Sequence, residues 1–106
     1  MKLPAFFDHV PRIRVIDPLA DLLGAAEDGV LEYGYPDAVK LSGHSCPTVA
    51  GAFLMTRTAL ARLYPQDMPR RGEVRVELRQ ALDAGVTGVI ASVAGLITGA
   101  ANEGGF

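Results

Sequence analysis

Residues 43–64 read GHSCPTVAGAFLMTRTALARLY and carry a long helical pattern. Its apolar residues recur near the spacing of one helix face: Val49, Phe53, Leu60 and Leu63. Pro47 suits the first position of a helix, because proline has no N–H group to pair there. Pro65 marks the end of the pattern. We therefore expect a substantially buried helix from Thr48 to Tyr64, entered through the loop that contains Cys46.

A shorter helix is predicted upstream. Asp17 is a residue that commonly caps a helix N-terminus, and Pro18 follows it at the first helical position. The helix should run to about Glu27 and end at Asp28-Gly29. Its inner face should consist of Leu19, Leu22 and Leu23.

The residues between these two helices favour a β-hairpin. Val30–Tyr35 is rich in strand-forming residues, Pro36-Asp37 is a turn signal, and Ala38–Leu41 suits a return strand. Residues 1–14 contain two prolines and two adjacent phenylalanines. We expect them to form an arm over the core without regular structure.

A strand and a helix are predicted downstream. Glu73–Leu78 alternates charged and apolar residues, the pattern of a strand with one wet face. Its inward side chains should be Val74, Val76 and Leu78. Residues 84–102 carry no charge, but glycine, serine, threonine and asparagine dilute their hydrophobicity. A buried helix from Val86 to about Thr98 is expected rather than a membrane span.

The order of these elements predicts the fold class. A helix, two strands, a helix, a strand and a helix suit an α+β domain, with helices packed on one face of a small mixed or antiparallel sheet. We expect one domain over residues 15–106. Three strands leave an exposed edge, so either the chain forms a homodimer or the natural domain continues beyond Phe106.

Composition excludes several classes of partner. The chain has 106 residues, a net charge of −2 and only one pair of adjacent basic residues, Arg70-Arg71, so no basic surface for nucleic acid is expected. The single cysteine cannot form an intramolecular disulfide, and the N-terminus lacks the pattern of a secretory signal. We therefore expect a cytoplasmic protein.

His44 and Cys46 are the candidate functional residues. The start of a helix favours a thiolate at Cys46, and residues two apart in a loop can converge on one metal ion. Zinc requires three or four protein ligands, so the pair is a half-site, meaning two ligands of an incomplete metal site. The hydroxyl groups of Ser42 or Ser45 could support it. The further candidate ligands are His9, Asp37, Glu77, Asp83 and Glu103.

Three other interpretations remain open. Cys46 could be the nucleophile or redox thiol of a metal-free enzyme, with His44 or His9 as its base. The chain could instead be an interaction module whose Gly95/Gly99 helix face binds a partner. Finally, Cys46 could simply pack in the core, as free cysteines often do.

The site motif resembles that of a known family. Gly43, His44, Cys46, Pro47 and Gly51 are similar to the G-H-x-C-P-x-x-x-G signature of the FmdE (FwdE-like) family, which takes its name from formylmethanofuran dehydrogenase. The resemblance covers about residues 15–106, and it places Ile97-Thr98-Gly99 where that family has a Thr-Gly step. It implies an α+β domain with a mixed sheet, usually dimeric, in which His44 and Cys46 bind a metal, in the first instance zinc, beside a cleft for a small molecule.

Two features depart from that family. Its members often have a cysteine and an aspartate at the start of the last helix, where this chain has Gly85-Val86-Thr87-Gly88. Many also carry a C-terminal zinc ribbon, but this chain has no second cysteine. The family name reflects operon context, so the resemblance implies no reaction.

Overall fold

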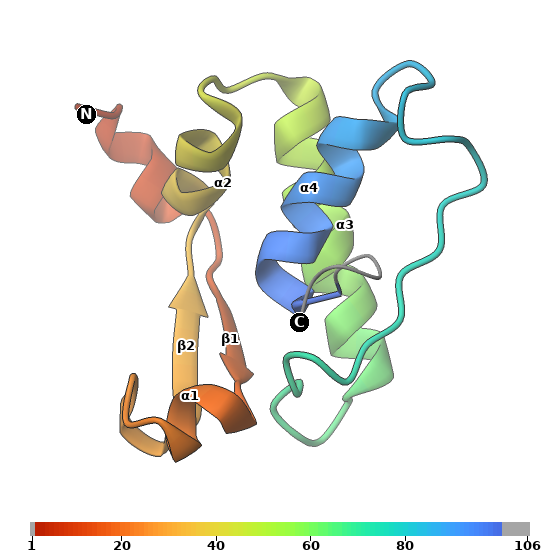
Figure 1. The fold of residues 1–106 in the computed structure, drawn as a ribbon. Coiled ribbons are helices and arrows are strands. Elements are labelled where there is room, and N and C mark those ends of the chain that lie inside the picture. The colour runs from red at the N-terminus through yellow and green to blue at the C-terminus, as the bar shows by residue number, and fades with distance from the viewer. Residues whose placement is uncertain (1, 101–106) are drawn as a thin grey trace.

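The computed structural model describes residues 2–100 and has an α+β fold (Figure 1). Its elements are the 3₁₀-helix η1 (Ala5–His9), strand β1 (Ile13–Ile16), helix α1 (Pro18–Leu22), the 3₁₀-helix η2 (Glu27–Gly29), strand β2 (Val30–Tyr33), and helices α2 (Tyr35–Ser42), α3 (Pro47–Leu63) and α4 (Thr87–Thr98). The two strands form one small antiparallel sheet beside the helices. The predicted fold class is confirmed.

Helices α3 and α4 form the centre of the fold and match the sequence prediction. They pack side by side (Figure 1), and their inner faces bury the largest fully enclosed side chains together with Val15 of β1: Phe53, Ile97, Val49 and Val93. Leu63 is an exception to the predicted buried face, because it lies in the last turn and is 63% exposed. Gly99 ends α4 in the left-handed conformation (φ 72°), and its N–H donates to the carbonyl oxygen of Gly95. Among residues 2–100, no helix combines the length and apolar character needed to cross a membrane.

The predicted hairpin is wrong, because the residues after β2 form helix α2. The carboxylate of Asp37 accepts a hydrogen bond from the N–H of Gly34 at 2.8 Å, so this aspartate caps a helix start rather than a turn. Tyr35, Ala38 and Val39 are buried at helical spacing. Gly43, with φ 78°, then ends the helix.

Strand β2 therefore pairs with β1 instead of a return strand. The antiparallel register runs from Ile13 opposite Tyr33 to Ile16 opposite Val30. Residues 1–14, expected to form an arm without regular structure, contain η1 and the start of β1. Phe7 of η1 is buried, and its ring meets that of Tyr35 edge to face at a centroid distance of 5.1 Å.

Helix α1 begins as predicted but is shorter. The Asp17 carboxylate accepts hydrogen bonds from the N–H groups of Leu19 and Ala20, at 2.9 and 3.2 Å. The helix ends at Leu22 rather than near Glu27, and the leucines predicted to face inward are exposed: Leu19, Leu22 and Leu23. The core is filled by side chains of η1, β1, α2, α3 and α4, and this five-residue helix at the end of the sheet adds no buried side chain to it.

The predicted third strand does not join the sheet. Residues 69–71 pair with the last residue on the free edge of β1, because the N–H of Ile16 donates to Pro69 and the N–H of Arg71 donates to the carbonyl of Ile16, both at 2.8 Å. Gly72, with φ 88°, then turns the chain away. Glu73–Leu78 consequently crosses toward α3 and α4. Of its apolar side chains only Val74 packs against the core, while the other two, Val76 and Leu78, are more than one-third exposed.

Candidate functional site

The loop between α2 and α3 places His44 and Cys46 together at the N-terminal end of α3. Cys46 is the N-cap residue, with an extended backbone, and Pro47 occupies the first turn as the sequence predicts. The thiol is free and partly buried against the core, whereas His44 is exposed. The pair is therefore anchored on one side and open to solvent on the other.

Two hydrogen bonds fix the shape of this loop. The hydroxyl groups of Ser45 and Tyr35 lie 2.6 Å apart and tie the loop to the buried start of α2. Nδ1 of His44 lies 3.1 Å from the backbone carbonyl oxygen of Ser42, so Nδ1–H is the donor. In the neutral ring this leaves Nε2 as the unprotonated nitrogen that a metal binds. The hydroxyl of Ser45 therefore holds the loop through Tyr35, and it is the backbone carbonyl of Ser42, not its predicted hydroxyl, that contacts His44.

The pKa values of the Cys46 thiol and the His44 imidazole are shifted in opposite directions. The pKa of the Cys46 thiol is lowered, first by the backbone N–H of Val49 and further by His44 and the N–H of Thr48, despite an opposing effect of burial. The pKa of His44 is raised, first by its hydrogen bond to Ser42 and then by Cys46. Each group therefore stabilises the charged form of the other. This is the environment of reactive or metal-binding cysteines.

The residues present fit zinc in kind but not in number. Thiolate sulfur and imidazole nitrogen are ligands that zinc favours. Within residues 2–100, however, no three side chains of the ligand types His, Cys, Asp and Glu come close enough to share an ion. The structure therefore does not add any of four predicted candidates to the pair: His9, Asp37, Glu77 and Asp83. The fifth candidate, Glu103, lies outside the described residues.

A cavity of about 380 Å³ lies beside His44. It lies between the end of α2, the loop before α4 and the first turns of α4, and its polar lining comes from Ser42, His44, Asp83 and Ser92. Gly88 is required here, because a Cβ atom at this position would lie 2.8 Å from the carbonyl oxygen of Leu82. Sequence reasoning did not find this cavity, since it joins segments that are distant in the chain and no local pattern reveals that approach.

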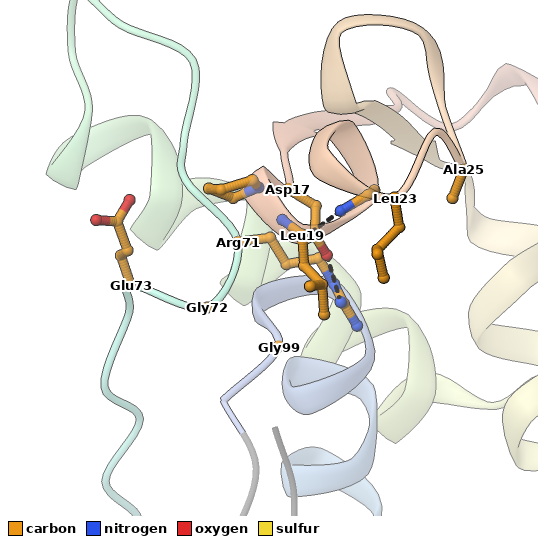
Figure 2. A pocket seen from close by; sticks show the side chains of 10 residues that line it. Asp17, Leu19, Leu23, Ala25, Arg71, Gly72, Glu73 and Gly99 are labelled. Carbon is orange, nitrogen blue, oxygen red and sulfur yellow. Dashed lines mark hydrogen bonds and ion pairs between the residues drawn. The ribbon is translucent and has the colours of Figure 1, made fainter.

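A second cavity, of about 520 Å³, surrounds an ion pair at the opposite end of α4 (Figure 2). Nη1 of Arg71 donates to the carboxylate of Asp17 at 2.9 Å, and both side chains are more than four-fifths buried. Nη2 and Nε of the same guanidinium donate to the carbonyl oxygen of Leu96, at 3.0 and 3.3 Å. All three nitrogens of Arg71 thus have partners within the protein. The Arg71 guanidinium therefore links the start of α1 to the last turn of α4. Its role is structural, and we do not assign a ligand to this cavity.

Comparison with protein-family models, curated proteins and solved structures finds no match to this chain. The resemblance to the FmdE family therefore rests on the motif residues alone, because the strand expected between the two long helices does not form.

Proposed function

We propose that the protein binds a divalent metal ion, in the first instance zinc, through the thiolate of Cys46 and Nε2 of His44. The observation that carries this proposal is the pairing of the two groups at the start of α3, where the pKa of the thiol is lowered and Nδ1–H of the imidazole is held by Ser42. The motif resemblance supports the same assignment.

Two protein ligands are fewer than the three of a catalytic zinc site, so we propose that the remaining coordination positions are open to other ligands. Catalytic zinc keeps at least one position for water or substrate, unlike a closed structural site with four protein ligands. The cavity beside His44 has room for a small molecule, and Asp83 and Ser92 give it polar groups that can hydrogen-bond such a ligand. We therefore propose that a small polar molecule binds next to the ion. A second copy of the chain could supply a further ligand.

Cobalt(II) tests the half-site directly, because a thiolate ligand gives it a near-ultraviolet charge-transfer band. The wild-type protein should develop this band in proportion to added cobalt and lose it when zinc is added. Cys46→Ala should abolish the band, and His44→Ala should weaken cobalt binding. His9→Ala removes the only other histidine and is the matched control. Absence of the band in the wild type, or its persistence in Cys46→Ala, would contradict the proposal.

A metal-free thiol enzyme or redox protein is the second candidate. It is favoured by the reciprocal pKa shifts of Cys46 and His44, together with the absence of a third ligand within residues 2–100. In this case Cys46 attacks an electrophile as the thiolate, and His44 exchanges the proton. Alkylation of Cys46 should then stay fast in excess chelator. A slow reaction under those conditions would exclude this candidate.

A further inference from the structure

The segment Glu73–Arg79 is a strand-like sequence without a strand partner. After the N–H of Glu73, which donates to Arg70, the backbone of residues 74–80 makes no hydrogen bond to any other described residue. The side chains of Arg75 and Glu77 are 86% and 71% exposed. Figure 1 shows this stretch (cyan to teal) running along the outside of the helices. Its N–H and C=O groups are therefore open to a second strand.

The apolar side chains of this segment lie along α3 and α4, although only Val74 packs against the core. Val74, Val76 and Leu78 line a groove of about 360 Å³ against α3 and α4. Met55 and Leu63 line the same groove and are more than half exposed. Arg75 and Glu77 also border the groove, but their side chains are mostly exposed, so the charged residues of the segment are more solvated than the apolar ones.

The charges along the segment are antisymmetric about Val76. In order they are Glu73, Arg75, Glu77 and Arg79, with an apolar residue between each pair. When two copies of such a sequence run antiparallel and Val76 faces its own copy, every charge faces its opposite. Glu73 meets Arg79 of the second copy, and Arg75 meets Glu77 of the second copy. On the other side, Val74 meets Leu78.

We propose that Glu73–Arg79 is a homodimer interface, in which two copies pair as an antiparallel two-stranded ribbon about Val76. A two-fold axis makes such an interface self-complementary, and main-chain hydrogen bonds would satisfy one exposed edge of each strand. Opposite charges directly across an antiparallel pair stabilise it, and like charges destabilise it. This interface is independent of the metal proposal, since it includes neither His44 nor Cys46.

The same charges select the register. A slip by two residues in either direction sets glutamate opposite glutamate and arginine opposite arginine. A slip by one residue places charged side chains opposite apolar ones, on the wrong face. Parallel pairing in register also brings like charges together. A parallel pair offset by two residues would also set opposite charges together, but it has no two-fold symmetry and so does not form a closed dimer. Among two-fold symmetric pairings, the antiparallel one centred on Val76 brings the most opposite charges together.

Two single charge reversals test this pairing. Arg75→Glu and Glu77→Arg each place like charges across the ribbon twice, so each variant alone should dimerise at least tenfold more weakly than the wild type. When the two variants are mixed, the glutamate introduced at position 75 faces the arginine introduced at position 77, and all four cross-strand pairs become opposite. The mixture should therefore form a 1:1 heterodimer of near wild-type affinity. The intrachain contact between Arg75 and Glu77 is lost in both variants, mixed or not, so it cannot explain recovery on mixing.

Sedimentation velocity in the presence of EDTA measures the association without metal. Because both side chains are exposed, thermal unfolding should show both variants folded. Cys46→Ala should dimerise like the wild type, which separates this test from that of the metal site. The proposal is overturned if the wild type stays monomeric at about 1 mM chain. It is also overturned if either variant dimerises like the wild type, or if the mixture fails to recover.

Discussion

Replacement of Asp17 by alanine should destabilise the protein substantially, because this side chain has two roles. It caps α1 through the N–H groups of Leu19 and Ala20, and it accepts a hydrogen bond from Arg71 at 2.9 Å. Loss of an N-cap costs about 1 kcal/mol, and a hydrogen bond between charged groups contributes about 1.5–3 kcal/mol. The pair retains some solvent exposure, so we expect a total loss of about 2–3 kcal/mol from the free energy of unfolding.

Asparagine separates the two roles. Asp17→Asn keeps a good N-cap and removes the charge that faces Arg71, so its loss should be about 1–2 kcal/mol. Urea denaturation followed by circular dichroism measures both variants, with Glu32→Gln as a control. Glu32 also pairs with arginines, but at the surface, so its replacement should have a smaller effect.

The pH dependence gives a second measure of the same contact. Burial raises the pKa of Asp17, but the hydrogen bonds from Arg71, Ala20 and Leu19 outweigh burial and lower it overall. A lowered folded-state pKa contributes stability above the unfolded-state value, about 3.9, and this stability is lost as the pH falls through the folded-state value. Asp17→Asn should therefore flatten the loss of stability below about pH 4. The reasoning would be refuted if the Asp17 variants had the urea denaturation midpoint of the wild type and lost stability with falling pH as steeply as the wild type does.

Three further changes probe the core, the cavity and the thiol. Phe53→Ala should cost about 3–5 kcal/mol, because the ring is fully buried, whereas Leu63→Ala at an exposed position should cost far less by the same denaturation assay. Gly88→Ala should lower the melting temperature, since its Cβ would strike the Leu82 carbonyl oxygen; a wild-type melting curve would contradict this. The alkylation rate of Cys46 should rise with pH to a plateau below the ordinary thiol pKa, and His44→Ala should shift this profile to higher pH. An unshifted profile would remove His44 as a partner.

Local signals predicted the elements that the structure confirms. Helix α3 has a proline at its start and an apolar face over 17 residues, and α4 is an uncharged segment closed by a glycine, so each is encoded within its own sequence. The N-cap at Asp17 and the position of Cys46 before Pro47 are equally local.

The errors came from features that depend on distant residues. Pro36-Asp37 fits a turn and a helix start equally well, and burial of Tyr35 and Val39 decides for the helix. Glu73–Leu78 has strand periodicity, but the chain meets β1 only at Ile16, through residues 69–71, and then turns away at Gly72. The bond between Ser45 and Tyr35 and the cavity beside His44 likewise join separate segments, so no local pattern could reveal them.

The most direct test of the proposed function is elemental analysis of the purified protein before and after incubation with zinc, followed by removal of free metal. Wild type, Cys46→Ala, His44→Ala and the control His9→Ala should be compared by mass spectrometry. The half-site predicts about one bound ion per chain or per dimer in the wild type and the control, and none in the other two variants. A wild-type protein that remains empty after incubation, or a Cys46→Ala variant that retains its full content of zinc, would contradict it.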